Sequence, residues 1–114
     1  MNINRLIKDS YRTACDKGWH DEHRTFGDLI ALCHSELSEA LEEFRQHGLD
    51  KDKMIYYNFE LQPEKPEGVA VELADLLIRV FDMCEYHSIP LAEALIAKLS
   101  YNKTRSYRHG NKKI

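Results

Sequence analysis

Residues 69–86 read VAVELADLLIRVFDMCEY, and this stretch decides the fold class. Its apolar residues recur at helical spacing around most of the circumference, leaving a polar strip that contains Glu72, Asp75, Arg79 and Asp82. A helix that is apolar nearly all round must be buried on several sides. Because four helices of this size rarely supply so much cover, the stretch predicts a homo-oligomer as well as an all-α fold.

The chain on either side of this stretch predicts further helices. Apolar residues at helical spacing predict one over residues 2–17. Thr25 and Asp28 look like a capping pair that opens another helix, over about residues 25–46. A proline suits the first turn of a last helix over about residues 90–107. The short connections favour a four-helix antiparallel bundle.

The segment before residue 69 has a different pattern. From residue 55 to residue 61 apolar and polar side chains alternate, which is typical of a strand, and two prolines follow. The sequence therefore predicts a short strand-like or irregular arm, rich in tyrosine, over residues 54–61. Beyond the last helix, RHGNKKI (108–114) is basic and is expected to be mobile.

Size and charge restrict the class of protein. With 114 residues, 43% of them hydrophobic and 31% charged, the chain is expected to form one domain over residues 1–114. A net charge of −3, from 16 basic and 19 acidic residues, provides no general basic field. Duplex nucleic acid is therefore not an expected partner.

The apolar stretches and the cysteines of the sequence indicate the cellular compartment. Charged residues interrupt every long apolar stretch, and the first residues, MNINRLIKDS, lack the apolar run of a signal peptide. A cytoplasmic protein without a membrane segment is expected. Three cysteines, an odd number and far apart, predict neither a disulfide framework nor a zinc site.

Acidic residues on two of the predicted helices suggest a metal site. Glu36 and Glu39 stand at i and i+3 on the apolar side of the 25–46 helix, and Glu72 and Asp75 repeat that spacing. Carboxylates turned toward a core must be protonated, paired with bases or neutralised by a cation, and Mg²⁺ prefers oxygen ligands. The two pairs therefore predict a magnesium site. Glu43, one turn beyond Glu39, is expected to support these ligands.

Two other interpretations of the acids stay open. Acids at helical spacing commonly lie on a solvated face or pair with Lys and Arg, which would suit a non-catalytic helical module for oligomerisation or interaction. A carboxylate-bridged di-iron bundle usually requires an ExxH motif on paired helices, which neither acid pair provides. Triphosphate cleavage that depends on magnesium would distinguish an enzyme from the module.

Basic and aromatic residues complement the acids. Lys98, Asn102 and Arg105 stand at i, i+4 and i+7, where they could bind phosphate, although a basic last turn also complements the helix dipole. Trp19, the only tryptophan, lies in a polar linker and could stack on a nucleobase. A tryptophan is, however, more often a core anchor. Most of the six histidines are expected at the surface.

Over nearly its whole length the chain resembles the MazG-like all-α nucleotide pyrophosphohydrolases. The resemblance is carried, in order, by HSELSEALEE (34–43), KPEGVAVELADLLIRV (65–80) and YNKTRSYRHG (101–110). It implies Mg²⁺-dependent cleavage of a nucleoside triphosphate between its α- and β-phosphates, which yields a nucleoside monophosphate and pyrophosphate. It also implies a dimer or tetramer with sites near the subunit contacts.

The resemblance assigns roles to individual residues. It implies that both acid pairs bind the metal, that Lys98 and Asn102 meet phosphate or metal, and that Trp19 lies near the base. A motif glutamate, Glu39 by preference, would orient or deprotonate the attacking water. The chain has Ser35 where many relatives have a further Glu, which bears on a second metal position. Its long arm could shape base choice or extend the subunit contact.

Overall fold

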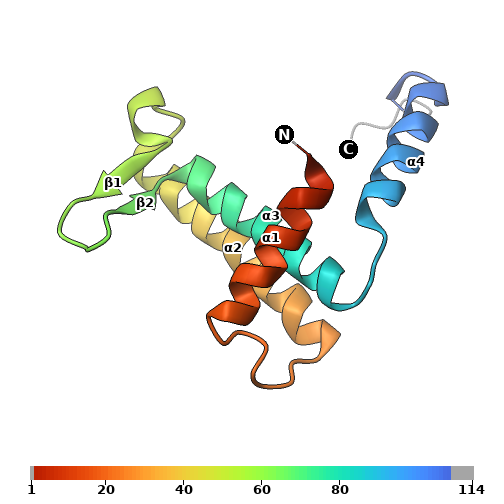
Figure 1. Ribbon diagram of the computed structural model, residues 1–114. Helices are drawn as coiled ribbons and strands as arrows, with labels where there is room; N and C mark the ends of the chain where they lie inside the picture. Colours follow the sequence, from red (N-terminus) through yellow and green to blue (C-terminus); the bar gives the residue numbers. More distant parts are fainter. Residues whose placement is uncertain (1, 109–114) are drawn as a thin grey trace.

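The computed structural model describes residues 2–108, and this part of the chain is mainly helical (Figure 1). Its helices are α1 (Ile3–Asp16), α2 (Phe26–His47), α3 (Val69–Tyr86) and α4 (Leu91–Thr104). Two short strands, β1 (Tyr56–Asn58) and β2 (Lys65–Glu67), and a 3₁₀ turn, η1 (Lys51–Lys53), connect α2 with α3. Of the predicted basic tail, residues 109–114 lie outside the described part.

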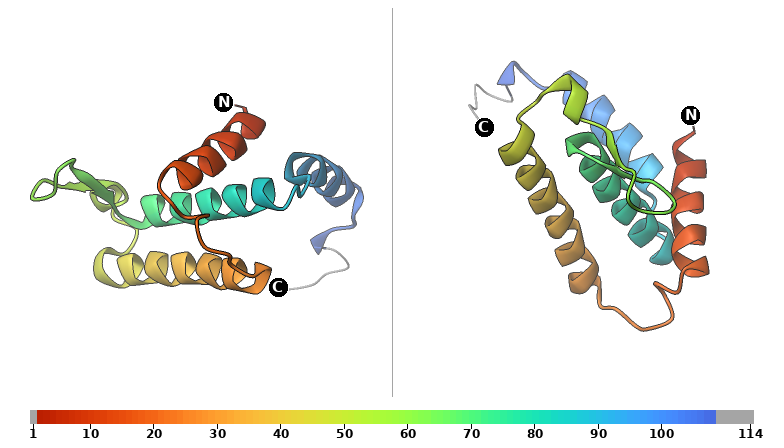
Figure 2. Two further views of the ribbon diagram at one scale, coloured as in Figure 1. Left: turned by 60° about the horizontal axis from the view of Figure 1, so that its bottom comes forward. Right: turned by 90° about the vertical axis from the view of Figure 1, so that its left-hand side faces the viewer.

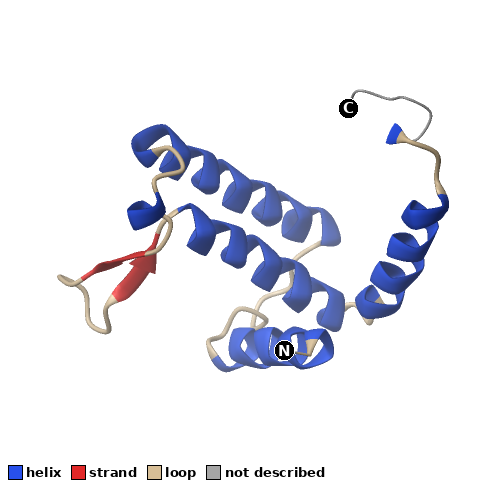
Figure 3. Cartoon of the chain, turned by 90° about the horizontal axis from the view of Figure 1, so that it is seen from above, coloured by secondary structure: helices blue, strands red, loops and turns tan. Residues whose placement is uncertain are grey.

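Helix α3 is the central element, as its apolar sequence predicts. It packs against α2 on one side and α1 on the other, and α2 and α3 run antiparallel (Figures 2 and 3). The α2–α3 contact is built on a small core of Leu29, Cys33 and Met83. Partly buried side chains extend this core, namely Leu32, Leu76 and Val80. The apolar sides of both helices are therefore held together directly beside their acid pairs.

The ends of α2 follow the local sequence. The Thr25 hydroxyl accepts a hydrogen bond from the Asp28 backbone N–H at 3.1 Å, and the Asp28 carboxylate accepts one from the Thr25 N–H at 3.2 Å. The predicted capping pair is thus confirmed as a reciprocal capping box. Gly48 ends the helix with φ of +59°, a conformation that side chains with a Cβ rarely adopt.

The predicted arm is an antiparallel hairpin at one end of the α2–α3 pair (Figure 1). Tyr57 of β1 lies opposite Pro66 of β2. The Tyr56 hydroxyl lies 3.0 Å from both carboxylate oxygens of Glu43 and donates to them, so that α2 fixes the base of the arm. Burial and this hydrogen bond raise the pKa of Tyr56 to about 12. Glu43 therefore anchors the arm, and its support of the metal ligands stays a prediction.

Helix α4 corrects the prediction of a four-helix antiparallel bundle. It stands away from the other three helices, and none of its side chains is buried (Figures 1 and 3). Its apolar residues are spread around the circumference, so it lacks the single apolar stripe that would seat it on α1, α2 or α3. Between residues 2 and 108, no helix combines the length and the apolar character that a membrane crossing requires.

The junction between arm and α3 depends on Gly68. With φ of +120°, a Cβ on Gly68 would lie 2.2 Å from the carbonyl oxygen of Met54, which accepts a hydrogen bond from the Ala70 N–H at 3.1 Å. We expect Gly68→Ala to lower the free energy of unfolding by about 2 kcal/mol or more, because both strain and a backbone clash oppose it. Denaturant unfolding measures this change.

A matched glycine provides the control. Gly27 lies in the first turn of α2, and a Cβ there would find only the Thr25 hydroxyl, at 3.8 Å. Gly27→Ala is therefore expected to leave stability unchanged or to raise it by up to about 1 kcal/mol. Equal effects of the two substitutions would show that the close approach at Gly68 does not constrain the arm.

Candidate functional site

The antiparallel packing of α2 and α3 brings acids of both predicted pairs together. Glu36, Glu39 and Glu72 each place one carboxylate oxygen so that the three oxygens lie within 4.8 Å of one another. Glu36 is buried, Glu72 is half-buried and Glu39 is exposed. The cluster thus runs from the helix interface to solvent, which leaves one side open to a ligand.

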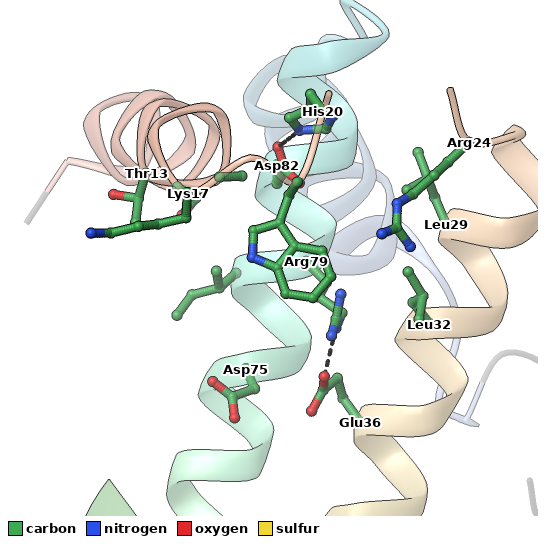
Figure 4. A pocket seen from close by; sticks show the side chains of 14 residues that line it. Thr13, Lys17, His20, Arg24, Leu29, Leu32, Glu36, Asp75, Arg79 and Asp82 are labelled. Atoms are coloured by element: carbon green, nitrogen blue, oxygen red, sulfur yellow. Dashed lines mark hydrogen bonds and ion pairs between the residues drawn. The ribbon is translucent and has the colours of Figure 1, made fainter. Parts of the chain in front are cut away.

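Asp75, the fourth predicted ligand, lies outside this three-residue cluster. It sits one turn beyond Glu72 on α3, and together with Glu36 it lines a neighbouring cavity (Figure 4). Its negative charge contributes to raising the pKa of Glu72, so the two carboxylates interact. Burial raises the pKa of Asp75 itself, while the nearby Arg79 opposes that rise.

The surroundings of Glu72 act strongly on its titration. Burial, a hydrogen bond with Glu39 and the charge of Asp75 raise the pKa of Glu72 from its usual 4.5 to about 7. Its Oε2 atom is buried and has no hydrogen-bond partner within residues 2–108. A buried carboxylate oxygen without a donor beside two further carboxylates is suited to a hard divalent cation, so the residues fit magnesium.

Arg79 enters the cluster from α3. Its Nε lies 2.5 Å from Oε1 of Glu36, and this ion pair crosses the interface between the two helices (Figure 4). Glu36 is only 7% exposed, so without Arg79 its carboxylate would be buried and unpaired. From the sequence, Arg79 was expected only in the polar strip of this helix, without a role at the site. Its position one turn after Asp75 was the available signal.

A cavity of about 280 Å³ adjoins the acids, between α1, the loop that follows it, α2 and α3 (Figure 4). Trp19 lines it and is 47% exposed, so this tryptophan is not the core anchor that was the alternative. The guanidinium carbons of Arg24 and Arg79 lie 5.2 and 5.5 Å from the centre of its ring. The Nε of Arg24 is buried and unpartnered within the described residues.

The loop that carries Trp19 is tied to α3 by His20. Nε2 of His20 and Oδ1 of Asp82 lie 2.7 Å apart, with side chains only 12% and 17% exposed. The imidazole also stacks on Tyr86, with ring centres 4.5 Å apart and planes 10° apart. His20 is thus an exception to the expectation that the histidines lie at the surface. No local sequence pattern signals this contact, because 62 positions separate its partners.

The predicted phosphate-binding residues do not reach the acids within one chain. Lys98, Asn102 and Arg105 lie on or directly after α4, and none of them lines the cavity. Lys98 and Arg105 instead flank Tyr101, at 5.1 and 5.5 Å from its ring centre. Lys98 and Asn102 lie on α4 as their spacing predicted, but α4 ends at Thr104 and Arg105 is already extended, so the helix is shorter than the predicted 90–107. A role of these residues at the site further assumed that α4 packs into the bundle.

The raised pKa of Glu72 predicts a stability effect that depends on pH. Between 4.5 and about 7 the folded protein binds more protons at Glu72 than the unfolded chain does. The stabilisation that Glu72 contributes to the folded protein is therefore fully present below pH 4.5 and is lost as the pH rises through about 7. At higher pH, where the Glu72 carboxylate is charged, bound Mg²⁺ should restore this stability.

Thermal unfolding with and without Mg²⁺ tests this behaviour. At about pH 8 without metal, Glu72→Gln is expected to raise Tm by roughly 4 °C, the shift that about 1 kcal/mol produces in a domain of this size, and to abolish stabilisation by Mg²⁺. Glu42→Gln, a change of an exposed acid on α2, should do neither. Equal stabilisation of wild type and Glu72→Gln by Mg²⁺ would contradict a metal site at Glu72.

Comparison of the chain with protein-family models, curated proteins and solved structures gave no significant match.

Proposed function

We propose that the protein is a Mg²⁺-dependent nucleoside triphosphate pyrophosphohydrolase of the MazG-like kind, acting in the cytoplasm. The observation that carries the proposal is the cluster of Glu36, Glu39 and Glu72, whose oxygens from two antiparallel helices lie within 4.8 Å of one another. Beside this cluster lie an aromatic plane and two guanidinium groups. A nucleoside triphosphate requires carboxylates that hold its metal, cations that bind its phosphates and an aromatic ring that stacks on its base.

The metal would be held by the three clustered glutamates, with Asp75 as a fourth carboxylate on the same side of α3. Bound magnesium would neutralise charge on the phosphate oxygens and lower the pKa of a coordinated water. The chain itself supplies a fixed set of oxygens, since the α2–α3 core holds both helices in place. Because Glu36 is buried, bulk water would compete little with its carboxylate for the metal.

The cavity suits one nucleoside. Its volume of about 280 Å³ is close to the lower end of ligand pockets. The half-exposed indole of Trp19 offers a stacking face at its wall. Because Glu36 and Asp75 line the same cavity, a base placed against Trp19 would direct its phosphates toward the acids.

The proposed reaction uses this placement. Water adds to phosphorus and the bridging P–O bond between the α- and β-phosphates breaks, so that a nucleoside monophosphate and pyrophosphate leave. Glu39 is the most exposed of the three clustered glutamates and is the one open to solvent water. We assign to it the orientation or deprotonation of that water.

A second copy of the chain would complete the assembly. Large apolar side chains remain exposed on three helices, namely Ile30, Leu37, Leu41 and Phe44 on α2, Leu73, Leu77 and Ile78 on α3, and Leu95, Ile96 and Leu99 on α4. So much exposed apolar surface is typical of a subunit contact. In a homodimer or homotetramer, α4 of one copy could bring Lys98 and Asn102 to the acids of another. The same surface also supports the alternative of a non-catalytic oligomerisation module.

Activity of substituted proteins tests the enzymatic proposal. With a panel of nucleoside triphosphates, wild type plus Mg²⁺ is expected to release pyrophosphate, and none without Mg²⁺. Glu39→Gln should lower turnover by roughly a hundredfold or more while the fold persists, because a general base contributes that much. Glu42→Gln, whose exposed carboxylate pairs with Arg45, is the matched control and should stay near wild type. If orthophosphate is the sole product, the bond between the α- and β-phosphates is not the one that is cleaved. If no triphosphate is cleaved at all, the enzymatic proposal fails and the non-catalytic oligomerisation module is favoured.

Mass in solution tests the assembly. Light scattering of wild type is expected to give a multiple of the 13.4 kDa chain mass. Leu37→Lys with Leu41→Lys should shift it toward the single-chain value, because two charges would be buried at the contact. Arg45→Gln, on the same helix, should keep the multiple. A wild type of single-chain mass at high concentration would refute the oligomer.

A further inference from the structure

We infer that Arg79 is a built-in counter-cation, which occupies Glu36 while the metal is absent and turns to the phosphates of the nucleotide when the metal takes Glu36. The inference rests on the proposed function and adds to it a residue that neither the acid motifs nor α4 contains. It is supported by the position of Arg79 between the acids and the cavity.

The first support is the contact itself. Arg79 holds Glu36 through Nε at 2.5 Å, so the two NH₂ groups of the guanidinium are not used in this bond. Among the described residues, Glu36 is the only buried charged residue. An isolated buried carboxylate is costly, and removal of its partner is normally destabilising. Arg79 thus performs, in the metal-free chain, the neutralisation that a cation would perform.

The second support is competition for one carboxylate. Glu36 belongs both to the ion pair and to the three-oxygen cluster. A divalent cation in that cluster would repel the guanidinium and attract the same carboxylate. The Arg79 side chain is 30% exposed, so it can move without leaving a packed core. Metal binding therefore favours its release from Glu36.

The third support is the surroundings that a released Arg79 would find. Its guanidinium already lies 5.5 Å from the Trp19 ring centre and lines the cavity with Arg24. Of the acids nearby, Asp82 is engaged by His20, and Asp75 is proposed as a metal ligand. A guanidinium prefers the forked geometry of phosphate oxygens. A triphosphate directed from the cavity to the acids would supply them.

Metal binding without nucleotide gives the first test. Calorimetric titration with Mn²⁺ at about pH 8 compares wild type with Arg79→Met, Arg79→Lys and the control Arg45→Met. Arg45 pairs with Glu42 at the same 2.5 Å but on the exposed face of α2. Arg79→Met is expected to bind Mn²⁺ roughly tenfold more tightly, because one positive charge near a divalent ion is removed. The Mn²⁺ affinity of Arg79→Lys should stay within about twofold of wild type, because the positive charge is kept. The affinity of Arg45→Met should do the same, because this substitution leaves the site unchanged.

Nucleotide binding gives the second test. At saturating Mn²⁺, an α,β-methylene triphosphate analogue, which cannot be cleaved at the proposed bond, replaces the substrate. Arg79→Met should weaken its binding at least roughly tenfold, and Arg79→Lys should weaken it less, since the charge remains and the fork is lost. Arg45→Met should not change it. A residue that only holds α2 to α3 would change stability without this opposite effect on metal and nucleotide.

The outcomes separate the inference from the proposed function. If wild type binds no Mn²⁺, the metal site and the proposed function fail together. If wild type and Arg79→Met bind Mn²⁺ equally, or if the analogue binds both equally, the counter-cation role fails while the metal site stands. Should Arg79→Met not fold, unchanged analogue binding by Arg79→Lys overturns the release to phosphate, and weakened binding supports it.

Discussion

Like charges on two packed helices impose the constraint on which the site depends. Glu36 and Glu39 on α2 face Glu72 on α3, with oxygens within 4.8 Å of one another. At about 5 Å and an effective dielectric constant of 20, one such pair repels by about 3 kcal/mol, as much as the burial of one large apolar side chain contributes. The small core around Leu29 and Met83 can therefore hold the helices together only if positive charge is present among the acids.

The metal-free chain has two sources of that charge. A proton resides on Glu72 up to a pH of about 7, and the Arg79 guanidinium holds Glu36. Together they bring two positive charges, which equals the charge of one magnesium ion. Exchange of a proton and a guanidinium for Mg²⁺ would therefore leave the net charge of the cluster unchanged. In this view the clustered acids are neutralised equally in the metal-free and the magnesium-bound chain. The Arg79 guanidinium would become available for phosphate only in the magnesium-bound chain.

Local sequence patterns predicted the helices closely, and the apolar sides of these helices predicted that acids of both pairs would meet, although Asp75 lies outside the cluster. Contacts between residues distant in sequence were missed. Residues 69–86 form the expected helix, and the capping box at Thr25 lies where its spacing placed it, because both depend on neighbours within one or two turns. The pairing of His20 with Asp82 and of Arg79 with Glu36 joins different elements, so no spacing reveals it. Helix α4 was correctly bounded at its start and wrongly packed, since helical spacing says nothing about the surface that receives a helix.

The free position of α4 links the proposed assembly to the proposed chemistry. A helix of 14 residues is marginal in water on its own, so α4 requires a surface that the described part of one chain does not provide. It carries apolar side chains, among them Ile96 and Leu99, together with the cations Lys98 and Lys103. The acids on α2 and α3 lie close to exposed apolar residues such as Leu37 and Leu73. In the proposed assembly, one region of a second copy would satisfy both the apolar and the charged features of α4, so that assembly and completion of the proposed phosphate site would be one event.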